Sequence, residues 1–356
     1  MMAGMNEHDF ALSIHAYYVG ELAAGLRACE RLLARGDLDD AMQHAVRFNR
    51  TWYTQPLCEY ADTRFVRFDI EPAHEGWSLF NPTVIVHDGQ LVAIVRSSNY
   101  QIVGGRYVMP DADQGTIRTE NILVRMRQDL TVSDAKVIAG PDYVRTGFPV
   151  TGLEDCRLRY TPAGIGVSAT VRDVAPHDGN CRIAVADLSV SEARFDSLRV
   201  LSGSTPLPHE KNWMPIHGTS AWLYMANLDG HTVSVDSDAD IPDAFSICRR
   251  STAPAIASQF RGGSQLVPFR GGLLGVIHEV AATPHRAYDH RFVWFDEGLS
   301  LRRMSVPFGI REPNTIEFAA GLAVLNDSVV VSFGVRDAEA WLVEMPASQV
   351  EGLLDA

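Results

Sequence analysis

The chain has 356 residues, of which 46% are hydrophobic and 21% are charged, and its formal net charge is -13. Such a composition is typical of a soluble globular protein with one to three domains. The acidic balance excludes a general nucleic-acid footprint and an anionic membrane surface as partners.

No apolar run approaches the roughly 18 residues that would span a bilayer. The N-terminus also lacks the basic and then apolar pattern of a secretion signal, so we expect a cytoplasmic protein. The five cysteines are irregularly spaced, which favours reduced thiols over a disulfide framework. No pair of them has the spacing of a zinc site. We therefore expect neither a metal nor an organic cofactor.

Residues 8–50 are the one clearly helical region. Apolar residues recur near helical spacing from Leu12 to Leu33, and Gly36-Asp37 then makes a break before a second helix that contains Met42. We predict a helical hairpin over residues 1–54. A single hairpin cannot bury its own apolar face, so it should pack on the rest of the chain, on a second copy or on a partner.

From about residue 75 the pattern changes to short apolar strands separated by turns. The Asp88-Gly89 step between two apolar runs is a strong hairpin signal. No long helical pattern intervenes up to about residue 346, which excludes alternating strand and helix winding. The sequence therefore predicts an all-β domain over residues 55–350, built as a five-bladed β-propeller. A β-sandwich is the alternative.

Polar residues occur at strand ends throughout this domain, and a propeller would gather them around one axial pocket. The pair Asp155 and Arg157 would share a strand face, as an anionic clamp, a general acid or a plain surface ion pair. Solvated strand ends are the competing interpretation for the others. The set comprises Asn81, Arg96, Asn99, Glu154, Asp155, Arg157, Lys211, Asn212, His278, Glu279, Tyr288, His290, Glu317 and Asp337.

In this order the motifs resemble glycoside hydrolase family 130, a family of five-bladed propellers. That family includes inverting mannoside phosphorylases and some hydrolases, and propeller mannosyltransferases are related to it. The resemblance covers roughly residues 80–345 and omits the helical region. Its motifs are Asn81-Pro82 with Arg96, Gly152-Leu153-Glu154-Asp155-Cys156-Arg157, Lys211-Asn212-Trp213-Met214-Pro215, Glu317-Phe318-Ala319-Ala320-Gly321-Leu322 and Gly334-Val335-Arg336-Asp337.

The resemblance implies a role for each matching residue. Asp155 would be the general acid, acting through a sugar hydroxyl, while Arg157 and Lys211 would bind the attacking phosphate, joined by His278. Asp337 would hold the sugar in the cleavage subsite. We predict that the remaining substrate contacts come from Asn81, Arg96, Asn99, Glu154, Asn212, Tyr288, His290 and Glu317.

The expected reaction is glycoside phosphorolysis with inversion, with an oligosaccharide or sugar phosphate as substrate and inorganic phosphate as co-substrate. An inverting hydrolase is the first alternative, and it would need a carboxylate base such as Glu279 or Glu210. A propeller-type glycosyltransferase is the second. Two non-enzymatic hypotheses are a glycan-binding module and a scaffold that binds other proteins.

Overall fold

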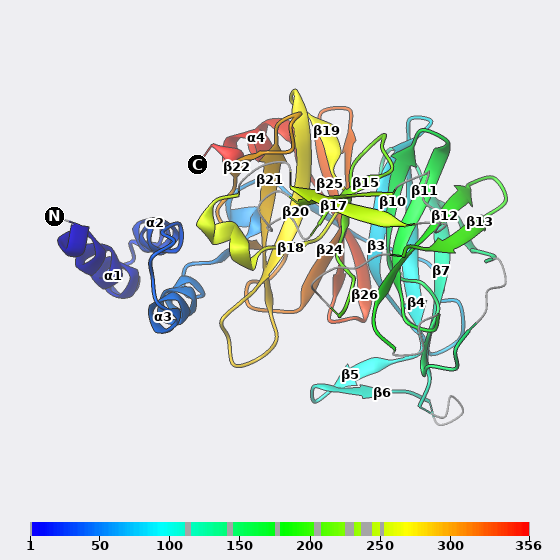
Figure 1. The fold of residues 1–356 in the computed structure, drawn as a ribbon, viewed down its shortest axis with the longest axis horizontal. Coiled ribbons are helices and arrows are strands. Elements are labelled where there is room, and N and C mark those ends of the chain that lie inside the picture. The colour runs from blue at the N-terminus through cyan, green and yellow to red at the C-terminus, as the bar shows by residue number, and fades with distance from the viewer. Residues whose placement is uncertain are drawn as a thin grey trace.

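The computed structural model describes residues 2–110, 115–140, 145–174, 179–202, 208–224, 231–235, 244–249 and 253–355. Helices form the N-terminal region and strands form most of the remainder (Figure 1). The prediction of a mainly β protein is therefore confirmed. The described helices after residue 54 include two short 3₁₀ turns, Leu57–Glu59 and Ala255–Gln259, and the C-terminal helix α4 (Ala347–Leu354).

The N-terminal region forms three helices: α1 (Met2–Tyr18), α2 (Leu22–Leu33) and α3 (Asp40–Arg50). The predicted two-helix hairpin is wrong in its number of helices, because the first predicted helix is divided in two. Gly20 lies at this break with a φ of 76°, a left-handed conformation that glycine adopts at little cost. Helix α3 follows the predicted break at Gly36-Asp37, and the Asp39 side chain caps it by accepting a hydrogen bond from the Met42 amide at 2.8 Å.

Five sheets of four or more strands follow one another along the described chain. The first contains β3 (Ser78–His87), β4 (Gln90–Ser98), β7 (Ile117–Met126) and β8 (Val132–Val137), with β9 (Val150–Thr151) paired to β7. The second contains β10 (Glu154–Thr161), β11 (Gly164–Val171), β12 (Arg182–Ser189) and β13 (Arg194–Val200). The third contains β14 (Met214–Pro215), β15 (Ala221–Leu223), β16 (His231–Val235) and β17 (Phe245–Arg249).

The fourth and fifth sheets each include a strand from the N-terminal half of the chain. The fourth contains β1 (Gln55–Pro56), β18 (Arg261–Gly262), β19 (Val267–Phe269), β20 (Gly272–Val280), β21 (Tyr288–Phe295), β22 (Leu301–Met304) and β23 (Phe308–Gly309). The fifth contains β2 (Arg64–Arg67), β24 (Glu317–Leu325), β25 (Ser328–Val335) and β26 (Glu339–Pro346). A separate two-stranded hairpin is formed by β5 (Gln101–Val103) and β6 (Arg106–Val108).

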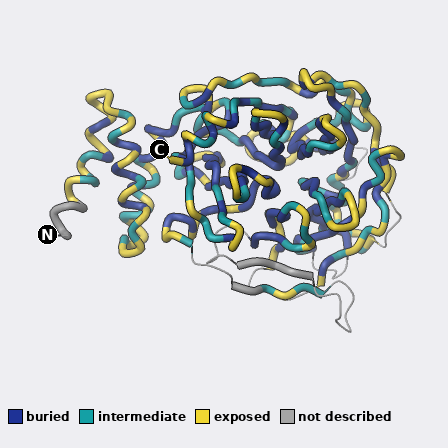
Figure 2. The backbone as a smooth tube through the Cα atoms, turned by 90° about the horizontal axis from the view of Figure 1, so that it is seen from above, coloured by how far each residue is buried: buried dark blue, intermediate teal, exposed yellow. Residues whose placement is uncertain are grey.

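The chain closes on itself through the fifth sheet. Strand β2 pairs antiparallel with β26, so that a strand from the start of the β domain completes the last sheet. Figure 2 shows the backbone of this domain arranged around a common centre, with buried residues between neighbouring sheets. Closure of this kind protects the sheet edges. It also differs from a two-sheet sandwich, which was the alternative.

The helical region packs on the fourth sheet through an apolar cluster. Leu26 and Cys29 of α2 and Val46 of α3 are buried together with Ile277 of β20 and Val293 of β21. Burial of apolar area is the main source of stability for such a contact, at about 25 cal/mol per Å². Packing on the rest of the chain is one of the arrangements expected for this region.

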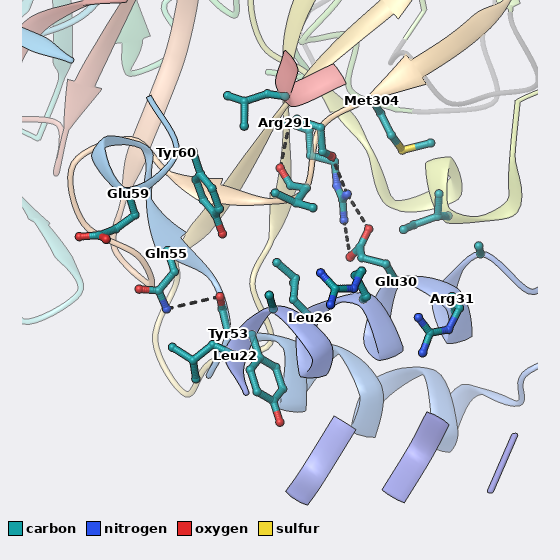
Figure 3. A pocket seen from close by; sticks show the side chains of 17 residues that line it. Leu22, Leu26, Glu30, Arg31, Tyr53, Gln55, Glu59, Tyr60, Arg291 and Met304 are labelled. Carbon is teal, nitrogen blue, oxygen red and sulfur yellow. Dashed lines mark hydrogen bonds and ion pairs between the residues drawn. The ribbon is translucent and has the colours of Figure 1, made fainter. Parts of the chain in front are cut away.

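A buried ion-pair network fixes the same contact. Arg50, the last residue of α3, donates from Nη2 to Glu279 at 3.0 Å and to Asp289 at 3.3 Å. Arg291 donates from Nε to Glu279 at 2.5 Å and from both terminal nitrogens to Glu30 of α2, at 2.7 and 2.8 Å. Figure 3 shows Glu30 facing Arg291 across the boundary between the helices and the sheet. Both arginines are at most 2% exposed, so this network ties α2 and α3 rigidly to β20 and β21.

The described cysteines Cys29, Cys58, Cys156 and Cys181 carry free thiols. In the described ranges, no helix combines the length and the apolar character that crossing a bilayer requires. The same ranges contain no group of three or more histidine, cysteine or acidic residues arranged to hold a metal ion.

Candidate functional site

A cavity of about 290 Å³ lies where strands of the first, second, fourth and fifth sheets meet the segment that leads into the third sheet. A propeller arrangement predicts such a meeting point, because residues distant in sequence come together at the centre. Residues singled out from the sequence line much of it: Asn81, Arg96, Glu154, Asp155, Lys211, Asn212, His278, Tyr288 and Asp337.

Irregular backbone lies beside this cavity. The register of β10 against β11 shifts between Glu154 and Arg157, and Asp155 at this bulge has a φ of 50°. Asn81 has a φ of 46° at a similar shift in β3, and Asn212 and Asp337 have φ values of 61° and 52°. Non-glycine residues in this region cost about 1–3 kcal/mol each and cluster at functional sites. Bulges are one device that re-aims a side chain.

Asp155 is held by two donors. Its Oδ1 accepts hydrogen bonds from Asn81 Nδ2 and from Arg96 Nη1, both at 2.9 Å. Burial raises the pKa of Asp155, but the charge of Arg96 and the bonds from Asn81 and Arg96 outweigh it, so the pKa lies below its usual value. Burial raises the pKa of the adjacent Glu154 and prevails there, although Arg96 lies 3.4 Å away. Asp155 is therefore ionised at neutral pH.

Cations outnumber carboxylates around the cavity, although the whole chain is acidic. Its carboxylates are Glu154, Asp155 and Asp337, and its cationic residues are Arg96, Arg172, Lys211, Arg261 and Arg286. In the part of the chain that the structure describes, no carboxylate lies within 4 Å of Lys211 or Arg261. Fixed cations without carboxylate partners attract an anion such as phosphate.

His278 lines the cavity as predicted, but it is neutral. Its ring lies between Tyr288 and Phe318, with ring centroids 5.0 and 5.2 Å away. Burial, followed by the neighbouring His290 and arginines, lowers the pKa of His278 well below its usual value. The prediction that this ring is cationic is therefore wrong. Its Nδ1 has no hydrogen-bond partner among the described residues and is available to a ligand.

Arg157 does not line the cavity, contrary to its predicted role as a phosphate ligand. Its Nε donates to the Gly263 carbonyl at 2.6 Å, and its Nη1 donates to the Asp155 carbonyl at 3.0 Å. Its Nη2 donates to Asn212 Oδ1 at 3.4 Å. Arg157 thus supports the Asp155 bulge and orients Asn212 from behind the cavity wall.

Three other predicted substrate ligands also lie outside the cavity lining, and each has a structural partner. Asn99 donates to the Thr116 carbonyl and accepts from the Arg118 amide. His290 is fully buried, stacks on Phe308, and has a pKa lowered by burial to about 3. Glu317 accepts from three successive backbone amides: those of Ile310, Arg311 and Glu312.

Neither glutamate proposed as a hydrolytic base lines the cavity. Glu279 belongs to the ion-pair network with Arg50 and Arg291. Burial raises its pKa, but these two cations outweigh burial and lower the pKa to about 2. Glu210 accepts from Trp213 Nε1 at 3.1 Å, and burial raises its pKa to about 7. These positions exclude both from direct contact with a substrate in this cavity.

Several functional candidates were missed from the sequence. Tyr100 donates from its hydroxyl to Asp337 Oδ2 at 2.9 Å, and Tyr107 of β6 packs edge to face on Tyr100 with centroids 5.1 Å apart. Arg286 donates from Nε to the Tyr288 hydroxyl at 2.6 Å. Arg172 and Arg261 also line the cavity. They lie in loops or short strands where no local pattern distinguishes them from surface residues.

A larger cavity, of about 660 Å³, lies between α2 and the fourth sheet (Figure 3). Its lining is mainly apolar, with Leu22, Leu26 and Met304 among the residues, and Glu30, one of its two carboxylates, is bound to Arg291. It lacks the convergent polar side chains of the central cavity. We therefore place the candidate chemistry in the central cavity.

Gly334 of β25 is expected to tolerate no side chain. A Cβ there would lie 2.1 Å from Asn81 Oδ1 and 2.5 Å from the Asn81 backbone nitrogen. Gly334→Ala should therefore displace Asn81, a donor to Asp155, and lower the free energy of unfolding by about 1–3 kcal/mol. Urea denaturation would measure this change. Gly352→Ala in α4 is the control, because its Cβ would meet nothing within 4 Å, and equal stability of the two variants would contradict the prediction.

No family model matches the sequence, and no curated protein matches it. Solved structures do match its fold. The β-1,2-mannobiose phosphorylase from Listeria innocua, in complex with β-1,2-mannobiose, has a TM-score of 0.54 and 14% identity, covering 82% of this chain and 99% of that chain. A glycosyl hydrolase from Bacteroides ovatus has a TM-score of 0.54 and 10% identity, covering 83% of this chain and 97% of its own.

A third matching structure belongs to glycoside hydrolase family 130. Its description says that this family of mannoside phosphorylases contains glycoside hydrolases that target β-1,2-mannosidic linkages in Candida mannan. Its TM-score is 0.52 at 13% identity, with 83% of this chain and 97% of that chain covered. At this level of sequence identity the similarity concerns only the fold. The reaction must therefore be inferred from the residues of the cavity. This chain has the fold of the mannoside phosphorylases and glycoside hydrolases of glycoside hydrolase family 130.

Proposed function

We propose that the protein makes or breaks glycosidic bonds with inversion, as a phosphorylase of mannoside-type oligosaccharides. One observation carries the proposal: the hydrogen-bonded carboxylate of Asp155 and the side chains of Lys211 and Arg261 border the same small cavity. Inverting transfer needs a proton donor on one side of the sugar and a nucleophile on the other. Phosphate as the nucleophile also needs fixed cations to bind its charge.

The proposal includes the architecture. The five sheets are assigned as the five blades of a propeller, with β2 completing the last blade beside β26. The helical region is an addition on the outside of the fourth blade. This assignment is supported by the position of the cavity, which receives residues from four of the sheets and, through Lys211 and Asn212, from the segment that leads into the third sheet.

In the cleavage direction, a phosphate oxygen attacks the anomeric carbon while the bond from that carbon to the glycosidic oxygen breaks. The leaving oxygen gains a proton supplied by Asp155, directly or through a sugar hydroxyl, and the products are a sugar 1-phosphate and a shortened saccharide. In the synthetic direction, the Asp155 carboxylate accepts the proton of the acceptor hydroxyl as phosphate leaves. The lowered pKa of Asp155 favours the carboxylate, which is the form that accepts this proton.

Other residues have positioning roles in this scheme. Asp337, which accepts from the Tyr100 hydroxyl, is suited to accept hydrogen bonds from hydroxyls of the reacting sugar. Asn212, oriented by Arg157, offers an amide group to the same space. Lys211, Arg172 and Arg261 would bind the phosphate, and the free Nδ1 of His278 would complete that site.

Hydrolysis is the second candidate, because Glu154 and Asp337 are further carboxylates in the cavity that water could use as a base. The surplus of cations favours phosphate over water. A panel of sugar 1-phosphates and manno-oligosaccharides, with and without inorganic phosphate, tests the proposal. We expect phosphate release from a sugar 1-phosphate when an acceptor is present. Phosphate-independent release of free sugar would support hydrolysis, and no turnover would contradict both.

Lys211→Ala is expected to raise the apparent KM for phosphate about ten- to a hundred-fold, because each charge-assisted contact contributes roughly 1.5–3 kcal/mol. The KM for the saccharide should change much less. Lys136→Ala is the matched control, since Lys136 is the only other lysine of the chain and lies on β8 with its side chain 58% exposed. Equal effects on both substrates would contradict a phosphate role for Lys211.

A further inference from the structure

A second polar cavity, of about 560 Å³, lies beside the central one, and we call it the α3 cavity. His44, Arg47 and Phe48 of α3 form one wall, and their spacing places them on one face of the helix. Gln259, Arg261 and Thr283 lie among the remaining lining residues. Arg261 also lines the central cavity, so the two spaces share this side chain.

The loop between β20 and β21 connects the two cavities as well. Its first part, through residue 284, lines the α3 cavity, whereas Arg286 and Tyr288 line the central cavity. The opposite wall is firmly placed, because Arg50 at the end of α3 is bound to Glu279 and Asp289. The α3 cavity therefore adjoins the central cavity at Arg261 and at this loop, and it is built in part by the helical region that the family resemblance omits.

The chemistry of the α3 cavity is cationic and aromatic. No aspartate or glutamate lines it, although the chain has 44 acidic against 31 basic residues. No carboxylate of the described residues lies within 4 Å of Arg47 or Arg261, and nearby Glu279 is already bound by Arg50 and Arg291. The Phe48 side chain is 42% exposed, and it offers an apolar face next to these donors.

We propose that the α3 cavity binds the distal, non-reacting part of an anionic oligosaccharide. Phe48 would pack against the apolar face of a sugar ring, while Arg47 would bind a carboxylate or phosphate group carried by the saccharide. Gln259 and Thr283 would bind hydroxyl groups. The inference rests on the proposed function of the central cavity, and it adds a substrate class: a chain bearing negative charge away from the reacting bond.

The test uses the full-length protein and three oligosaccharides of equal length: neutral, uronate-bearing and phosphomonoester-bearing. Isothermal titration calorimetry should show that at least one charged chain binds about ten- to a hundred-fold more tightly than the neutral chain. Arg47→Gln should remove that difference, and Phe48→Ala should weaken all three chains. Arg27→Gln and Tyr18→Ala are matched controls, because both residues are exposed on the helical region and lie outside the α3 cavity.

Preference for the uronate-bearing or for the phosphomonoester-bearing chain would identify the anionic group. Equal binding of all three chains, or equal effects of Arg47→Gln and Arg27→Gln, would overturn the proposal. Kinetics with a neutral disaccharide tests the proposed reaction of the central cavity separately from saccharide binding in the α3 cavity. Disaccharide turnover with no effect of Arg47→Gln on charged chains would overturn the α3 cavity alone. Arg47-dependent binding of charged chains without any turnover would overturn only the proposed reaction.

Discussion

Asp155→Asn is expected to lower kcat by about 10²- to 10⁴-fold, the usual range for loss of a general acid or base. Asparagine keeps the size of the side chain and can still accept the hydrogen bonds that Asn81 and Arg96 donate. It cannot release or accept the proton of the glycosidic oxygen. The dissociation constant of the oligosaccharide should therefore change little. Steady-state kinetics in both directions and calorimetry on the same preparations would measure the two effects.

The control for this substitution is Asp88→Asn, because the Asp88 side chain is 89% exposed and lies outside the cavity lining. It should leave kcat unchanged. A glycan-binding module without turnover would tolerate Asp155→Asn, and so would an enzyme that uses another acid. A loss of less than tenfold in kcat with unaltered binding would therefore contradict the proposed role of Asp155.

The state of Asp155 also sets the expected pH dependence. In synthesis Asp155 must be ionised, so kcat/KM should be constant above its pKa and fall as the pH drops through it. Because Arg96 and Asn81 hold this pKa below its usual value despite burial, the fall should begin at unusually low pH. The profile is measured in synthesis, and a fall that began near neutral pH would contradict an ionised Asp155 with a lowered pKa.

The second large effect is expected from Arg50→Met, which should lower the free energy of unfolding by about 3–5 kcal/mol. Arg50 is 2% exposed and binds Glu279 and Asp289, which are themselves at most 2% exposed. Methionine fills a similar volume but leaves both carboxylates with fewer cationic partners in a buried site. Denaturant unfolding followed by circular dichroism would measure the loss, and the contact between helices and sheet should weaken first.

Arg31→Met provides the comparison for Arg50→Met. Arg31 also pairs with a carboxylate, that of Asp9, but its side chain is 52% exposed. Exposed pairs contribute about 0–1 kcal/mol, so this variant should be almost as stable as the natural protein. If Arg50→Met destabilised the protein no more than Arg31→Met, the buried ion pairs would not stabilise the contact between the helices and the sheet.

The class of the β domain could be predicted from the sequence because strand and turn signals are local. Alternating apolar residues and the Asp88-Gly89 turn predict a hairpin, and β3 and β4 pair at this turn, with His87 opposite Gln90. Helix boundaries were harder. The break at Gly20 divides one predicted helix into two, and a single glycine within an otherwise helical pattern is a weak signal.

The sequence by itself determined the strand-end polar residues and the motif around Asp155, since both are properties of short segments. Only the tertiary structure decided which of those residues face the cavity. A shift of one residue turns a strand side chain to the other face, and the bulge at Asp155 makes such a shift. Arg157 shows the consequence, because its partner Gly263 lies 106 residues away and turns a predicted phosphate ligand into a support for the cavity wall.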